Sequence, residues 1–405
     1  MLPGFPFASL RHRNFRLFFA GQTTSLVGTW MQSVAQGWLV LELTDSVFWV
    51  GLVTALSALP VLLFSLPAGV YVDRANKHRI ILVSQVLMAV AAAVLAVLVA
   101  AGVVRPWHVA AIAALVGCLS AVEIPARQSF IVDLVGKEDL TNAIALNSSA
   151  YNATRILGPI LAGLIIARAD MTVCFAANAI SKGAVVAGLV GMRLPPFRPA
   201  LLEGRVHEHL LEGLLFARRN RGVWALILMT AVFSIFGFQF TVLLPVFARD
   251  VLAVGPGGLG VMSAAVGIGA VFSALMVAAA GVRIARGALV RWSGPAFGLS
   301  VALFALARWY PLVLLLLALG GFFMVANNAA TNTLLQGMVP DSLRGRVMSL
   351  WTFVFVGFAP IGSFQVGWLG EYVGAPVAVA LGGLLSALAA WWMWWRYAPE
   401  VAELR

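Results

Sequence analysis

Three ionisable side chains lie inside long apolar stretches of the sequence, where a charge is costly. Glu123 lies towards the end of one stretch, and Arg155 and Lys182 lie near the centres of two others. Such side chains face a protein interior or a water-filled cavity, and they mark sites of ion or substrate binding. Because burial favours the uncharged form of a carboxyl group, Glu123 is a candidate proton carrier. The two cations favour an anionic or polyphenolic ligand.

A purely structural interpretation of the same residues stays open. Glu123 and Arg155 could form an ion pair that fixes two helices, and Lys182 could face a loop or a lipid headgroup.

Polar side chains also repeat at helical spacing within three of the apolar stretches. Surfaces that face lipid do not carry such stripes, so these residues line a cavity or join helices. The stripes are Ser25, Thr29, Gln32 and Gln36; Asn147, Tyr151 and Asn152; and Asn327, Asn328, Thr331, Asn332 and Gln336. The predicted substrate contacts are Gln32, Gln36, Asn152, Arg155, Lys182, Asn327 and Asn328.

The composition predicts that lipid surrounds most of the chain. Of 405 residues, 61% are hydrophobic and 11% are charged, whereas a soluble domain carries about a quarter charged residues. A membrane helix needs about 20 apolar residues, and strands of a membrane barrel are shorter and alternate in polarity. We therefore predict an all-α membrane protein with twelve transmembrane helices. They span residues 15–42, 48–71, 80–103, 106–126, 142–167, 171–193, 223–248, 257–281, 287–307, 310–336, 346–370 and 375–395.

The distribution of basic residues predicts how these helices are oriented. If the chain starts in the cytoplasm, cytoplasmic segments hold 21 of the 27 Lys and Arg residues, and four lie on the opposite side. This asymmetry is the positive-inside pattern. It predicts a multi-pass protein of the bacterial inner membrane with both termini in the cytoplasm. The net charge of +11 does not indicate nucleic-acid binding, because the basic residues form no single soluble patch. We expect no cleavable signal peptide.

The longest polar stretch, residues 194–222, divides the chain into two equal sets of helices. We predict a six-helix bundle over residues 1–193, a cytoplasmic linker with an amphipathic helix, and a second six-helix bundle over residues 223–405. Because six is even, both halves insert the same way round, which fits a parallel pseudo-twofold repeat. Asp45, Asp139 and Asp341 each precede a predicted helix that they could cap.

The loop between the second and third predicted helices contains Gly69, Asp73, Arg74, Lys77 and Arg79. It resembles the signature loop of the major facilitator superfamily, although Asn76 stands where glycine is usual. The resemblance implies a conformational latch. In such a latch the aspartate and the basic residues engage the start of the eleventh helix, which carries Asp341, Arg344 and Arg346.

Gly158, Pro159 and Gly163 resemble the antiporter motif of the same superfamily, with Thr154 and Ala162 at two positions where glycine is usual. Further similar segments lie at residues 125–128, 212–220 and 339–349. In this order they resemble the branch that contains the enterobactin exporter and macrolide-efflux proteins.

This resemblance implies secondary active export of a siderophore-like or drug-like molecule by alternating access, with proton antiport. The expected partners are a small-molecule substrate, protons and the lipid bilayer, and we expect a monomer. We expect no cofactor, metal or enzymatic activity, because the sequence has no catalytic constellation, metal-ligand spacing or glycine-rich phosphate loop. Uptake, lipid flipping and a non-transporting assembly role remain alternatives.

Overall fold

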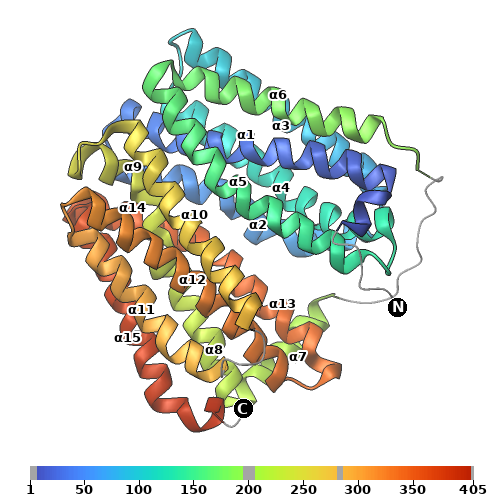
Figure 1. Cartoon of the computed structure of the whole chain (residues 1–405), viewed down its shortest axis with the longest axis vertical. Helices are drawn as coiled ribbons and strands as arrows, with labels where there is room; N and C mark the ends of the chain where they lie inside the picture. The colour runs from blue at the N-terminus through green and yellow to red at the C-terminus, as the bar shows by residue number, and fades with distance from the viewer. Residues whose placement is uncertain (1–6, 195–205, 281–285, 403–405) are drawn as a thin grey trace.

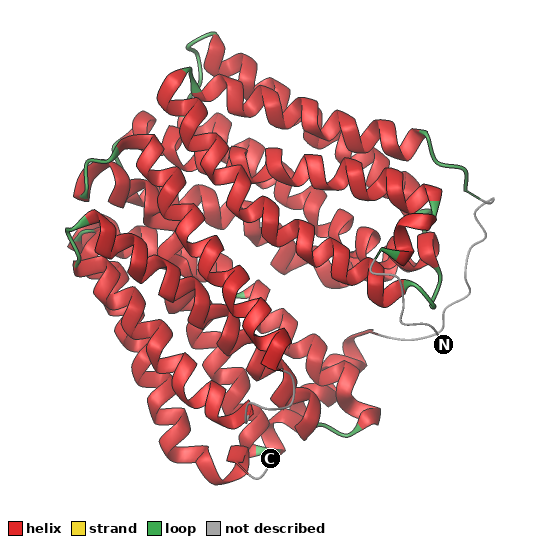
Figure 2. Ribbon diagram, in the orientation of Figure 1, coloured by secondary structure: helices red, strands yellow, loops and turns green. Residues whose placement is uncertain are grey.

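The computed structural model describes residues 7–194, 206–280 and 286–402, and these residues form helices joined by short connections (Figure 2). Within these ranges, 11 helices are long and apolar enough to cross a membrane. They include every predicted span except the first. The helix α1 (Arg13–Thr44) has 32 residues, which is long enough, but its buried Gln22, Ser25 and Gln32 lower its hydropathy. It corresponds to the first predicted span, residues 15–42.

The first group of helices precedes the predicted linker. Here α1 packs against α5 and α6, α2 against α4, and α3 against α4 and α6. The bounds after α1 are α2 (Val47–Arg74), α3 (Lys77–Ala100), α4 (Pro106–Val135), α5 (Leu140–Arg168) and α6 (Met171–Val190).

The second group comprises the helices from Val206 onwards and so includes α7, which lies within the predicted linker, whereas residues 195–205 of the linker lie outside the described residues. Here α10 packs against α12, α11 against α12 and α15, and α7 against α13. The bounds are α7 (Val206–Arg219), α8 (Arg221–Val232), α9 (Leu244–Val246), α10 (Gly255–Ala280), α11 (Arg286–Leu306), α12 (Tyr310–Met338), α13 (Asp341–Gly357), α14 (Ala359–Val373) and α15 (Ala375–Ala402).

Two predicted spans are irregular. The seventh contains π-helical turns at Phe233–Gly237 and Phe247–Val251, and a 3₁₀ segment at Phe238–Leu243 lies between them. Such irregular turns within helices are frequent at functional sites. The eleventh is divided into α13 and α14 near Phe358, just before Pro360, since proline has no N–H for the helical ladder.

The predicted aspartate caps are wrong in detail. Asp45 ends α1 in the left-handed conformation, with φ of 49°, and Ser46 is the residue that caps α2. Asp139 occupies the N-cap position of α5, but its side chain makes no capping hydrogen bond. Its carboxylate instead contacts Nε2 of His12 at 2.8 Å. Asp341 lies inside the first turn of α13, one residue after its N-cap.

The two groups of helices meet through glycines near one end of the molecule. The start of α2 packs on α14, where Gly51 faces Gly367, and the last turns of α5 pack on α10, where Gly163 faces Gly260. Figure 1 shows the two groups diverging towards the end where the start of α1 and α7 lie. We call the joined end, with its α1–α2 connection, the closed end and the other the open end.

We expect Gly163→Val to weaken the junction of α5 and α10. A Cβ atom at Gly163 would lie 2.9 Å from the carbonyl oxygen of Pro256 and 3.0 Å from Cα of Gly260. Overpacking of this kind costs about 1–3 kcal/mol, so thermal unfolding in detergent should begin at a lower temperature. The matched control is Gly183→Val on α6, where a Cβ atom would meet nothing within 4 Å. Equal effects of the two substitutions would contradict the prediction.

Candidate functional site

A cavity of about 620 Å³ lies where the two groups of helices face each other. Helices α1 to α6 supply most of its wall, and the irregular stretch after α8 and the start of α10 supply the rest. Among the predicted substrate, proton-coupling and gating residues, those lining it are Gln32, Gln36, Glu123, Arg155, Pro159 and Lys182, and Ser25 and Thr29 of the first polar stripe line it too. Tertiary packing thus brings together side chains from four separate helices.

Glu123 is buried, with 5% of its surface exposed. One of its carboxylate oxygens, Oε1, accepts hydrogen bonds from Nε of Arg127 at 3.1 Å and from Nε2 of Gln85 at 3.3 Å. The ion pair considered for Glu123 and Arg155 is therefore replaced by one between Glu123 and Arg127. The predicted span ended at residue 126, but α4 continues to Val135, so Arg127 lines the cavity one turn beyond Glu123 rather than lying in a loop.

The other two cations of the cavity have different surroundings. Lys182 is buried, with 6% of its surface exposed, and it lies within electrostatic range of Glu123, which attracts it, and Arg127, which repels it. Arg155 is partly exposed, and its Cζ lies 6.0 Å from the ring centroid of Trp30. In the described part of the chain, no hydrogen bond or ion pair holds either cation. Both cationic groups thus remain available to a ligand.

Asn178 and Gln85 are among the cavity residues that were not predicted from sequence. Asn178 on α6 donates from Nδ2 to Oε1 of Gln32 at 2.6 Å, which ties α6 to α1. Gln85 is a buried amide in the middle of the apolar helix α3. Both residues could have been predicted from the sequence. Asn178 lies one turn before Lys182 on the same helix face, and Gln85 lies within a largely apolar stretch.

Three predicted substrate contacts lie outside the lining of this cavity. Asn152 donates from Nδ2 to the carbonyl oxygen of Ser148 in its own helix, at 2.8 Å. Asn327 is buried, and its Oδ1 accepts a hydrogen bond from the hydroxyl of Thr331 at 3.3 Å. Asn328 neighbours it on α12 and is likewise absent from the cavity wall. The polar stripe of α12 thus includes contacts within its own helix.

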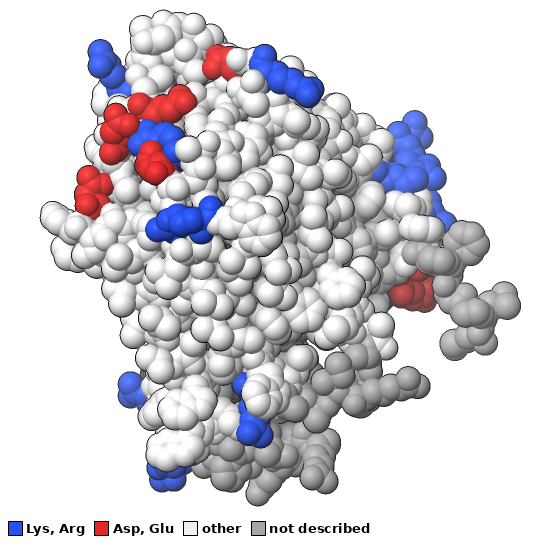
Figure 3. All heavy atoms as spheres, turned by 60° about the vertical axis from the view of Figure 1, so that its left-hand side comes forward, with Lys and Arg blue, Asp and Glu red and all other residues white. Residues whose placement is uncertain are grey.

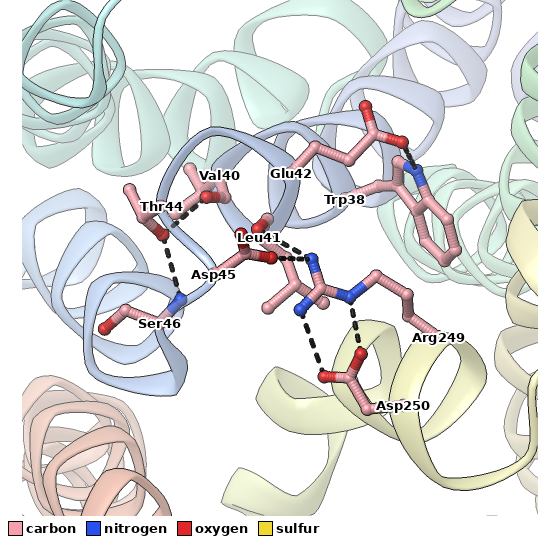
Figure 4. A network of polar contacts seen from close by, with 9 residues as sticks. All are labelled: Trp38, Val40, Leu41, Glu42, Thr44, Asp45, Ser46, Arg249 and Asp250. Carbon is pink, nitrogen blue, oxygen red and sulfur yellow. Dashed lines mark hydrogen bonds and ion pairs between the residues drawn. The ribbon is translucent and has the colours of Figure 1, made fainter.

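A polar network joins the two groups at the closed end (Figure 4). Arg249 donates from one guanidinium nitrogen to the carbonyl oxygen of Leu41 at 2.9 Å and to Oδ1 of Asp45 at 2.8 Å. Its Nε contacts the neighbouring carboxylate of Asp250 at 2.6 Å. Since Asp45 ends α1 and Arg249 ends the seventh predicted span, this network holds the two groups together at the closed end.

A second contact between the groups lies at the N-terminus of α2, where a residue of the second group caps the helix. One carboxylate oxygen of Glu371, near the end of α14, accepts from the hydroxyl of Ser46 at 3.0 Å and from the backbone N–H of Phe48 at 2.9 Å. A carboxylate at a helix N-terminus is favoured by the free N–H groups and by the helix dipole. Figure 3 brings this side of the molecule forward and shows most of its acidic side chains in one cluster with basic ones, next to a broad uncharged surface.

The residues of the predicted latch lie at the open end. Lys77 pairs with Asp133 of α4 at 2.8 Å, and Arg74 is exposed. A Cβ atom on Gly69 would meet nothing within 4 Å. The side chain of Asp73 lies outside the described residues.

The start of α13, the predicted partner of this loop, binds within the second group. Arg344 pairs with Asp341 at 2.5 Å, and Arg346 pairs with Glu212 of α7. The second pair attaches the amphipathic helix α7 of the linker to α13.

The antiporter-like residues lie at helix contacts. Gly158 faces Trp30 on α1, and Gly163 faces Gly260 on α10. Pro159 lies between them and lines the cavity. This part of α5 therefore contacts both groups of helices and the cavity.

Residues 5–404 match the model of the transmembrane secretion effector family. The chain belongs to this family. The protein is therefore a multi-pass membrane transporter of the major facilitator superfamily, as the signature loop predicted.

The sequences of individual relatives align with most of the chain. The staphyloferrin A transporter of Staphylococcus aureus is 26% identical, covering 86% of this chain and 87% of its own. The macrolide efflux protein A of Streptococcus pyogenes is 23% identical over 93% of this chain and 95% of its own. The enterobactin exporter of Escherichia coli is 25% identical over 91% of this chain and 88% of its own. The resemblance to this efflux branch is confirmed.

A solved structure shows the same fold. It is a bacterial homologue of the human lysosomal transporter Spinster in an inward-facing, unoccupied conformation. The TM-score is 0.76 with 13% sequence identity, over 97% of this chain and 98% of that chain.

We expect Arg249→Ala to loosen the closed end, because it removes the contacts to Asp45 and to the Leu41 carbonyl. The ion pair is 25% exposed at Arg249 and 83% exposed at Asp45, and exposed pairs contribute about 0.2–1 kcal/mol. The population with a joined closed end should therefore fall by no more than a few-fold. Spin labels at Val103 and Val377, exposed positions at this end of the two groups, would report it as longer distances.

The control for this measurement is Arg308→Ala. Arg308 lies at the same end but donates only to carbonyl oxygens of Ala305 and Ala307. Cys118 and Cys174 are replaced in all variants so that labels attach only where intended. A distance distribution for Arg249→Ala that matches the control would show that the network does not hold this end closed.

Proposed function

We propose that this protein exports a small organic molecule across the bacterial inner membrane by alternating access, in exchange for protons. The observation that carries the proposal is the cavity between the two groups of helices, with Glu123, Arg127, Arg155 and Lys182 in its wall. Family membership supports transport, and the named functions of the enterobactin exporter and macrolide efflux protein support the outward direction.

The two groups of helices act as the moving units in this proposal, with residues 1–193 and 223–405 as six-helix halves and 194–222 as their linker. The open end faces the cytoplasm, because the basic residues predicted to be cytoplasmic include those of the α2–α3 loop and the start of α13. Substrate then enters from the cytoplasm. Release requires the closed end to open and the open end to close, through the loop of Asp73 and the start of α13.

Proton coupling in this proposal depends on Glu123. Its carboxylate attracts Arg127 while it is charged, and protonation would remove that attraction inside a region of low dielectric, where it is strongest. A proton on Glu123 would also raise the net positive charge of the cavity by one unit. Proton binding therefore changes both the helix contact between Glu123 and Arg127 and the affinity of the cavity for charged substrate.

We expect inverted membrane vesicles with an acidified lumen to accumulate substrate, and a protonophore to abolish the accumulation. The panel comprises an anionic siderophore, a macrolide and a lipophilic cation. Glu123→Gln should lower gradient-driven accumulation at least about tenfold, since glutamine cannot exchange a proton. Glu138→Gln, in the exposed loop before α5, is the control and should transport normally. Normal gradient-driven transport by Glu123→Gln would remove Glu123 from the coupling step.

A further inference from the structure

The charges in the cavity wall all come from the first group of helices. Glu123 and Arg127 lie on α4, Arg155 on α5 and Lys182 on α6. The residues that the second group contributes carry no charge: Thr241, Val242, Leu244, Pro245, Leu259, Ser263 and Val266. The cavity thus has a charged side and a mostly apolar side. A ligand that fills it meets both groups of helices at once.

The one carboxylate in this wall is already matched by a cation. Glu123 accepts from Arg127 at 3.1 Å and from Gln85 at 3.3 Å, and only 5% of the residue is exposed. Glu123 therefore neutralises one of the three basic residues of the wall. With all four groups charged, the wall carries a net charge of +2.

Lys182 and Arg155 account for this excess. In the part of the chain that the structure describes, neither forms a hydrogen bond or an ion pair, and Lys182 is 6% exposed. Burying an ionised side chain without a partner is strongly unfavourable. An anion in the cavity would supply the missing acceptors, and the loss of that penalty would favour its binding.

We propose that the cavity selects an amphiphilic organic anion with two acidic groups, one for Lys182 and one for Arg155, and with an apolar body. This inference rests on the proposed function, whose substrate class it specifies. The apolar body lies against Val242, Leu244 and Leu259 of the second group. Such a ligand links the two groups of helices, because its two acidic groups bind one group and its apolar body packs against the other.

The ring of Trp30 completes the charged side of this site. It packs on Tyr151 with ring centroids 5.7 Å apart, and the Arg155 guanidinium lies next to it. An aromatic ligand body can stack on such a wall while its acidic group reaches the guanidinium. The amide pair of Gln32 and Asn178, joined at 2.6 Å, borders the cavity beside Lys182 and offers further polar contact.

Binding of a matched series tests the two-point site without any proton gradient. Purified protein in lipid nanodiscs is titrated by calorimetry with biphenyl-4,4′-dicarboxylate, its monomethyl ester, its dimethyl ester and the corresponding bis(aminomethyl) dication. Each hydrogen bond to a charged partner is worth about tenfold or more in affinity. We therefore expect the dianion to bind about tenfold more tightly than the monoester, and the diester and the dication to bind weakest.

Variants then assign the two acidic groups to their cations. Lys182→Gln and Arg155→Gln should each weaken dianion binding about tenfold and leave diester binding unchanged, whereas Lys182→Arg should retain dianion binding. The control is Lys137→Gln in an exposed loop. Wild-type protein that binds no dianion more tightly than its diester overturns the proposal. If Lys182→Gln does not fold, the binding of the wild-type ligand series and of Lys182→Arg still tests the proposed anion site.

The two proposals fail in different ways. Tight dianion binding without gradient-driven transport would contradict proton-coupled export while the substrate class stands. Gradient-driven transport of the macrolide or the cation, with no preference for the dianion in binding, would overturn the anion site while the export function stands.

Discussion

The central constraint on this structure is the cost of placing charge where water is scarce. For Glu123 this cost is offset by hydrogen bonds from an arginine one turn away and from a glutamine of α3. For Lys182 and Arg155 no hydrogen bond or ion pair within the described protein offsets this cost, and both residues line a cavity instead. Helices α1, α3, α4, α5 and α6 are arranged around these few groups, so the polar interior of the first group and the cavity form one unit.

The contacts between the two groups of helices are of a different kind. Glycines such as Gly51 and Gly163 let backbones approach closely at the closed end, and close packing of this sort drives helix association in lipid, where the hydrophobic effect is absent. Few polar contacts are added, and those of Arg249 and Glu371 lie near the aqueous surface, where water can replace them. A junction held in this way is stable yet can open without leaving buried polar groups unpaired.

The predictions from sequence were most accurate where lipid imposes length and hydropathy, and least accurate where neighbouring helices decide. Eleven of the twelve predicted spans meet the length and hydropathy of a membrane helix, because a bilayer demands about 20 apolar residues in each. The predicted end of α4 came too early in the sequence, because a basic residue such as Arg127 is typical of a loop. Its pairing with Glu123 is seen only in the folded structure. Asp45 was expected to cap α2, but Arg249, over 200 residues away in the chain, binds it instead.

The sequence by itself determined that the chain spans a membrane, which superfamily it belongs to, and which rare ionisable side chains lie within the spans. These follow from local composition and short motifs, because the low dielectric of lipid acts on each segment separately. The tertiary structure alone decided which polar and ionisable side chains share a cavity. Asn152, Asn327 and Asn328 lie outside the wall of the cavity, whereas Gln85 and Asn178 lie within it. Pairing among buried polar groups depends on distances between helices, and helical periodicity fixes the face of each side chain but not the helix that the face meets.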